Sequence, residues 1–187
     1  MIHPIRLFGD PVLRRRAQPV TKFDEGLAAL AADMLATMYA AEGVGLAAPQ
    51  IGVPLRMFVA LQVPEREGDD SPPDGRLEHV MVNPVITRRA GVQLGRDGCL
   101  SIPGLFVEDV PRDLTVEVAY QDLSGGKHEL TADGYFAHVL QHEHDHLEGI
   151  LFYDRLPPQR RGTFLEENRR ELADMQRRAK AFLREQR

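Results

Sequence analysis

The sequence is poor in cysteine and in aromatic residues. Its 187 residues include one cysteine, Cys99, and no tryptophan, and aromatic residues make up 6% of the chain. One cysteine cannot form an intrachain disulfide, and it excludes structural zinc sites built from four cysteines or from two cysteines and two histidines. The scarcity of thiols favours a reducing, cytoplasmic setting.

Long apolar runs and an excess of positive charge are also lacking. No apolar run reaches the roughly 18 residues of a membrane-spanning helix, and none near the first residues resembles a secretory signal, so no membrane partner is expected. The net charge of −5 excludes a global attraction to DNA. Hydrophobic residues at 43% and charged residues at 27% are typical of a globular chain, and the length predicts one domain over 1–187.

Apolar periodicity and turn residues predict a mixture of helices and antiparallel strands. Helices are predicted at about 24–42, 133–149 and 158–187. Strands are predicted at 55–61, 80–86 and 115–121. Asn83–Pro84 interrupts the second strand and indicates an edge or a bulge. The third strand leads into a hairpin loop at Ser124–Lys127, and strands joined by hairpins favour an antiparallel sheet.

Two segments stand out by composition. Residues 64–79 hold three prolines and many charges, which predicts a surface loop insertion. The predicted helix at 158–187 is amphipathic, and from Gln159 onward it has nine arginines and lysines against five acidic residues, a net charge of +4. A solvated helix packed on the domain accounts for this charge. The alternative is contact with an anionic partner such as ribosomal RNA.

Four of the seven histidines fall within one short stretch of the second long helix: His138, His142, His144 and His146. His142 and His146 enclose Glu143 in an H-E-x-x-H pattern. Residues four apart lie on one helix face with Cβ atoms about 5–6 Å apart, so both imidazoles can bind one metal ion. Glu143 lies beside the metal and can accept a proton from metal-bound water. The alternative is a histidine-rich surface helix.

A catalytic metal needs a third protein ligand, and the residue pattern leaves it open. A metzincin-type third histidine is excluded because Phe152 occupies its position. A thermolysin-like zinc metalloprotease would use a downstream glutamate such as Glu166. Cys99 would instead supply a thiolate and leave the fourth position free for water. A catalytically idle metal-binding module, in which Glu143 has no role, is a further alternative.

Three motifs together resemble those of bacterial peptide deformylase. Gly43–Gln50 (GVGLAAPQ), Asp97–Ser101 (DGCLS) and His142–His146 (HEHDH) occur in the order of that family. The resemblance implies an α+β fold in which antiparallel β-sheets surround a central helix carrying the metal motif, with an N-terminal and a C-terminal helix. It also implies removal of the formyl group from N-formylmethionine of nascent polypeptides, with release of formate.

The resemblance further implies a role for each motif residue. Cys99, His142 and His146 are expected to hold one divalent metal ion per chain, natively Fe(II), for which zinc, nickel or cobalt can substitute. Glu143 is expected to be the general acid–base. Gln50 is expected to donate a hydrogen bond to the oxyanion that forms during hydrolysis.

Further residues are expected to contact the N-formylmethionyl peptide. The backbone N–H of Leu100 is expected to be a second oxyanion donor. Gly43 and Gly45 are expected to let the peptide backbone lie alongside, Val44 to face a substrate side chain, and Val139 to form a wall of the methionine pocket. His138 is expected at the pocket rim or behind the ligands.

The second motif departs from the family at its first residue, where Asp97 replaces the usual glutamate and is shorter by one methylene. In the family this carboxylate pairs with an arginine, for which Arg112 is the match. Because all the expected ligands remain, we expect this substitution to adjust the properties of the metal site and not to abolish the site. His144 and Asp145 are expected to face away from the metal, with Asp145 supporting the helix or a ligand.

Overall fold

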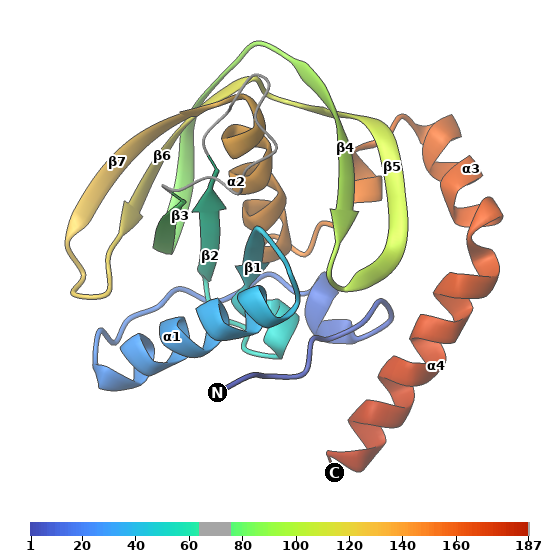
Figure 1. Ribbon diagram of the computed structural model, residues 1–187, viewed down its shortest axis with the longest axis horizontal. Coiled ribbons are helices and arrows are strands. Elements are labelled where there is room, and N and C mark those ends of the chain that lie inside the picture. Colours follow the sequence, from blue (N-terminus) through green and yellow to red (C-terminus); the bar gives the residue numbers. More distant parts are fainter. Residues whose placement is uncertain (64–75, 187) are drawn as a thin grey trace.

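The computed structural model describes residues 1–63 and 76–186 (Figure 1). Its helices are α1 (Glu25–Ala40), α2 (Gly134–Leu147), α3 (Pro158–Glu167) and α4 (Arg169–Glu185). Its strands are β1 (Gly45–Ala47), β2 (Met57–Gln62), β3 (Leu77–Ala90), β4 (Gln93–Cys99), β5 (Ile102–Arg112), β6 (Thr115–Gln121) and β7 (Lys127–Asp133). No helix in the part of the chain that the structure describes is long and apolar enough to cross a membrane.

Two antiparallel sheets form the β part of the fold and confirm the predicted α+β class. The larger sheet has the strand order β1-β2-β3-β6-β7, and β4 pairs with β5 in the smaller one. The strand predicted at 80–86 is longer, and β3 lies in the middle of its sheet. Its register shifts between Val82 and Val85, and Asn83 adopts a φ of 50°. Asn83–Pro84 therefore marks a bulge and not an edge.

Helix α2 lies between the larger sheet and the β4–β5 pair (Figure 1). It packs on β1 and β2, and its Leu140 joins a buried cluster with Phe58 of β2. Asp133 precedes the helix, and Gly149 follows it with a φ of 73°. A Cβ at Gly149 would lie 2.6 Å from the carbonyl oxygen of Arg14, so only glycine fits this position. Asp133 and Gly149 thus bound the helix as the sequence predicts, and the metal motif that it carries lies in the interior.

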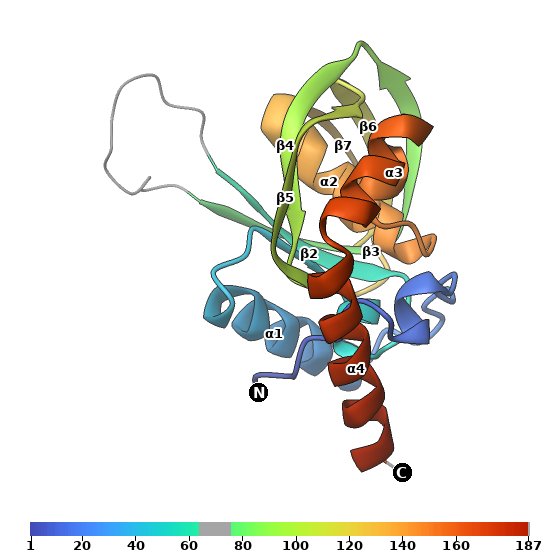
Figure 2. The ribbon, with the colours of Figure 1, turned by 90° about the vertical axis from the view of Figure 1, so that its right-hand side faces the viewer.

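The C-terminal segment forms two helices where the sequence predicts one. Asn168 separates α3 from α4, and its Nδ2 donates to the Phe164 carbonyl oxygen at 2.8 Å. The same carbonyl oxygen also accepts from the Asn168 backbone N–H at 3.2 Å, so both bonds close the last turn of α3. Figure 2 shows α4 extending past the sheets toward the C-terminus. The predicted amphipathic character holds, because the inward face of α4 buries Leu172, Met175 and Ala179.

Several local predictions are corrected. Strands β1 and β5 are not predicted, and prolines and glycines such as Pro103 and Gly104 obscure the alternation in β5. Strand β4 ends at Cys99. Of the loop predicted at 64–79, residues 64–75 lie outside the described residues, and 77–79 belong to β3.

Candidate metal centre

The three proposed ligand side chains converge. Cys99 ends β4, His142 and His146 lie one turn apart on α2, and their ligand atoms lie within 4.8 Å of one another. Cys99 Sγ is 3.3 Å from His146 Nε2. Glu166, the alternative third ligand, lies on α3 with its side chain 75% exposed and 3.4 Å from Arg169. The thermolysin-like arrangement is therefore wrong, and the site is a Cys-His-His metal site.

The Cys99 thiol ionises readily. Burial raises its pKa, but the facing imidazoles of His146 and His142 outweigh this effect and lower the pKa to about 5. Cys99 is accordingly a thiolate at neutral pH, the form that binds metals. A thiolate and two imidazoles leave one position of a tetrahedral metal open, as in catalytic sites.

Asp97 orients the His142 ring, with 2.8 Å between its Oδ1 and His142 Nδ1. Burial raises the pKa of Asp97, but His142, His138 and Arg112 outweigh it and hold the pKa well below its usual range. An ionised carboxylate only accepts, so His142 Nδ1 carries the proton and Nε2 keeps its lone pair for a metal. His146 differs, because its buried Nδ1 has no hydrogen-bond partner among the described residues.

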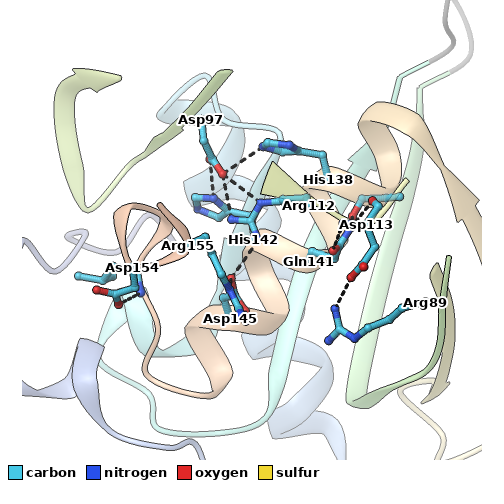
Figure 3. Close-up of polar contacts among 12 residues, drawn as sticks. Arg89, Asp97, Arg112, Asp113, His138, Gln141, His142, Asp145, Asp154 and Arg155 are labelled. Atoms are coloured by element: carbon cyan, nitrogen blue, oxygen red, sulfur yellow. Dashed lines mark hydrogen bonds and ion pairs between the residues drawn. The ribbon is translucent and has the colours of Figure 1, made fainter. Parts of the chain in front are cut away.

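Asp97 belongs to a buried chain of charges behind the ligands (Figure 3). Arg112 donates from Nε and Nη2 to Asp97 Oδ2 at 3.1 and 2.9 Å, and from Nη1 to Asp145 Oδ2 at 2.9 Å. Arg155 Nε donates to the same Asp145 oxygen at 3.0 Å. The expected Asp97–Arg112 pair is confirmed, and Asp145 supports that pair. These two carboxylates and Arg112 are between 2% and 5% exposed, so each charge depends on its partners.

Glu143 is a buried carboxyl that pairs with no arginine among the described residues. The residue is 4% exposed, and its Oε2 has no hydrogen-bond partner among the described residues. Burial raises its pKa to about 7 against the opposing effect of His142 and His146. A Cβ at Gly45 would lie 2.8 Å from Glu143 Cδ, so the backbone of β1 runs directly over this carboxyl. An unpartnered acid beside two ligand histidines suits proton transfer next to a bound metal.

The side-chain amide of Gln50 is fixed through its oxygen, and its nitrogen points toward the metal site. Its Oε1 accepts from the Ala47 backbone N–H at 2.9 Å. Its Nε2 lies 3.2 Å from Ser101 Oγ and 3.6 Å from Cys99 Sγ. The side chain is therefore both a loop amide that bonds to backbone and an N–H donor aimed at the metal site.

A cavity of about 640 Å³ opens in front of the ligands. Five of the residues expected to contact the substrate or its oxyanion line it: Val44, Gly45, Gln50, Leu100 and Val139. Its wall also includes residues that the sequence analysis did not assign: Arg96, Phe106 and Tyr135. These come from β4, β5 and the start of α2, and no local spacing in the sequence links them.

A Cys-His-His site with one open position, a buried glutamate beside it and a cavity in front defines a metal-dependent hydrolase. A family model described as polypeptide deformylase matches residues 2–162. The peptide deformylase of Thermus thermophilus is 53% identical over 189 residues, which cover 99% of this chain and 98% of that protein. The chain belongs to the peptide deformylase family.

Solved structures agree with this assignment. The crystal structure of a Thermus thermophilus peptide deformylase matches with a TM-score of 0.87 at 52% identity, over 95% of this chain and 99% of that one. The Plasmodium falciparum peptide deformylase matches with a TM-score of 0.80 at 32% identity, over 95% and 98%. The activity is metal-dependent removal of the N-formyl group from nascent peptides, as the three motifs imply, and the idle-module alternative is excluded.

Proposed function

We propose that Glu143 is the general acid–base of the deformylation. A divalent metal held by Cys99, His142 and His146 would polarise the formyl carbonyl and lower the pKa of a coordinated water. Glu143 accepts the proton of the attacking water and returns it to the leaving amine. The observation that carries this role is Glu143 Oε2, which has no hydrogen-bond partner within the described chain, on a residue that is 4% exposed beside two ligand histidines.

In this proposal Gln50 Nε2 and the Leu100 backbone N–H stabilise the oxyanion that develops on the formyl oxygen. The bond from Ala47 to Gln50 Oε1 fixes the amide with its donor end toward Cys99. Leu100 follows Cys99 directly and lines the same cavity. Donors that are already oriented need no rearrangement as the charge develops, which favours the transition state.

The N-formylmethionyl peptide is proposed to extend the larger sheet at β1. That strand stands at one end of the strand order, and Val44 and Gly45 line the cavity. An extended peptide can add to such an edge through backbone hydrogen bonds. Val139, one turn of α2 from the ligand His142, is proposed as a wall for the methionine side chain.

Fe(II) is the proposed native metal, as the family resemblance implies, with zinc, nickel or cobalt able to substitute. A thiolate and two imidazoles are suitable ligands for all of these ions, and availability selects among them. The donor set supports one divalent ion per chain.

The proposal is tested by formate release. The protein is purified without oxygen in the presence of Fe(II) and assayed with formyl-Met-Ala-Ser, with acetyl-Met-Ala-Ser as the matched substrate control. We expect formate from the formyl peptide, no cleavage of the acetyl peptide, and no activity of Cys99→Ala. A folded, metal-loaded protein that releases no formate would contradict the proposed reaction.

We also propose that residues 1–187 form one catalytic domain, which acts in the cytoplasm and contacts the ribosome through α4. The outward face of α4 supports this contact, since it exposes the basic side chains Arg170, Arg177, Arg178, Lys180 and Arg184. Cosedimentation with large ribosomal subunits should decrease with added salt and in a double variant, Arg177→Glu with Arg178→Glu. Unchanged sedimentation of that variant would argue against the contact.

A further inference from the structure

His138 is a buried imidazole that the proposed reaction does not use. It lies on α2 one turn before the ligand His142, and its side chain is 6% exposed. Its Nε2 is 3.1 Å from Asp97 Oδ2. A dashed line in Figure 3 marks this contact. Its ring stacks on Tyr135 with centroids 6.1 Å apart, and a Cβ at Gly95 would lie 3.1 Å from its Nδ1. The ring is therefore confined between Tyr135 and the backbone of β4.

The contact with Asp97 makes His138 a partner of the ligand His142. The ionised carboxylate of Asp97 faces both imidazoles: Oδ1 accepts from His142 Nδ1, and Oδ2 lies 3.1 Å from His138 Nε2. Arg112 binds the Oδ2 oxygen, and Oδ1 also accepts from the Gly98 backbone N–H at 3.0 Å. The Gly98 bond lies within β4, next to Asp97 itself, so among the described residues only Arg112 and His138 contact Oδ2 from other elements. His138 approaches it from α2, whereas Arg112 approaches it from β5.

We propose that His138 is a positioning residue, which fixes the carboxylate of Asp97 and thereby holds His142 in place for the metal. With aspartate at position 97, the carboxylate lies within reach of the His138 ring, 3.1 Å from its Nε2. The proposal rests on the proposed function insofar as the metal serves deformylation. Its prediction for metal binding is independent of the reaction.

The chain offers a matched control for this histidine. His128 Nε2 also contacts an aspartate Oδ2, that of Asp122 at 2.6 Å, but at the β6–β7 hairpin, where the histidine is 47% exposed. His138→Leu and His128→Leu therefore remove the same kind of pair, one behind the metal site and one on the surface. His138→Gln keeps an N–H donor near the position of Nε2 and serves as the conservative variant.

The experiment measures the dissociation constant of Zn²⁺ from each protein by competition with a colorimetric chelator. Loss of a partner of a ligand histidine typically weakens metal binding by about 10–100-fold, and we expect about tenfold for His138→Leu because Arg112 still holds Asp97. His138→Gln should stay within about threefold of the wild type, since it keeps the donor. His128→Leu should leave Zn²⁺ affinity unchanged.

A double-mutant cycle separates a role through Asp97 from a merely structural one. If His138 acts through Asp97, the effects of His138→Leu and Asp97→Asn on Zn²⁺ affinity are not additive, and additive effects would overturn the proposal. Equal Zn²⁺ affinity of His138→Leu and His128→Leu would also overturn it. If His138→Leu does not fold, the His138→Gln variant decides, and a tenfold loss there counts against the proposal. A wild type that binds Zn²⁺ but releases no formate would refute only the proposed function.

Discussion

The ion pairs behind the metal centre and those on α4 have the same chemistry but different surroundings. Arg112 lies 2.9 Å from Asp97, and the two side chains are 2% and 3% exposed. Arg177 lies 3.0 Å from Asp174 on α4, and these side chains are 70% and 53% exposed. The N···O distances in the two pairs are nearly equal, so the pairs differ in how far their side chains are exposed to solvent. A buried charge depends on its partner, whereas water replaces the partner of an exposed one.

Glu143 gives the largest expected effect, because it is a buried acid that pairs with no arginine in the part of the chain that the structure describes. We expect Glu143→Gln to lower kcat by about 10²–10⁴-fold, the usual contribution of a general acid–base, while the Zn²⁺ dissociation constant changes little. Glu171→Gln, at an exposed position of α4, is the control and should leave kcat unchanged. Steady-state formate release measures both. A fully active Glu143→Gln would remove this residue from the mechanism.

Removal of the buried Arg112 side chain is expected to have the next largest effect. Arg112→Met keeps the length of the side chain but leaves Asp97 and Asp145 without its charge. We expect a loss of about 3–5 kcal/mol in the free energy of unfolding, as for other buried pairs broken at one partner. Urea denaturation of the metal-free protein measures it. A loss below about 1 kcal/mol, the range of surface pairs, would show that burial does not distinguish the two regions.

The ionisation of Cys99 tests the buried region without removing an arginine. Its pKa of about 5 is lower than that of a free thiol, so the thiolate is present above pH 5 and is lost as the pH falls through that value. The ultraviolet absorbance of the thiolate in metal-free protein, kept anaerobic, reports this titration for a single cysteine. His146→Ala should move the midpoint upward. A wild-type midpoint near the ordinary value of about 8.5 would contradict the effect of the two imidazoles.

The smallest effect is expected on α4. Arg177→Met and Asp174→Asn should each change the free energy of unfolding by less than about 0.5 kcal/mol, with a coupling energy in the same range. A double-mutant cycle followed by thermal unfolding measures the coupling, and added salt should reduce it further. A coupling of several kcal/mol would place this surface pair in the same class as Arg112–Asp97.

Local signals in the sequence identify much of the fold. Helices α1 and α2 are predicted because an aspartate precedes each of them and apolar residues recur on one face. Strand β6 is predicted because its residues alternate. In β5, Pro103, Gly104 and Pro111 break the pattern, and its partner β4 is itself only half-buried. Such a strand is specified by pairing, which a single sequence does not display.

Prediction of the metal site from the sequence has the same limit, because contacts between different elements are not displayed in the sequence. The spacing of His142 and His146 predicts two ligands because both lie on one helix. Cys99 comes from a different element, so residue chemistry alone left Glu166 as a competitor, and the motif order of the family favoured the cysteine. The contacts of Asp97 with His138 and His142 depend on how β4 packs against α2, and no spacing in the sequence encodes that packing.

The close approach of Gly45 to Glu143 has a consequence for the breadth of the substrate range. Because a Cβ at this position would lie 2.8 Å from Glu143 Cδ, this part of the cavity wall is bare main chain. Main-chain donors and acceptors engage features common to all peptides, whatever their side chains. In the proposed binding mode, this wall would therefore let one enzyme accept peptides that differ in sequence, because it contacts only their main chain.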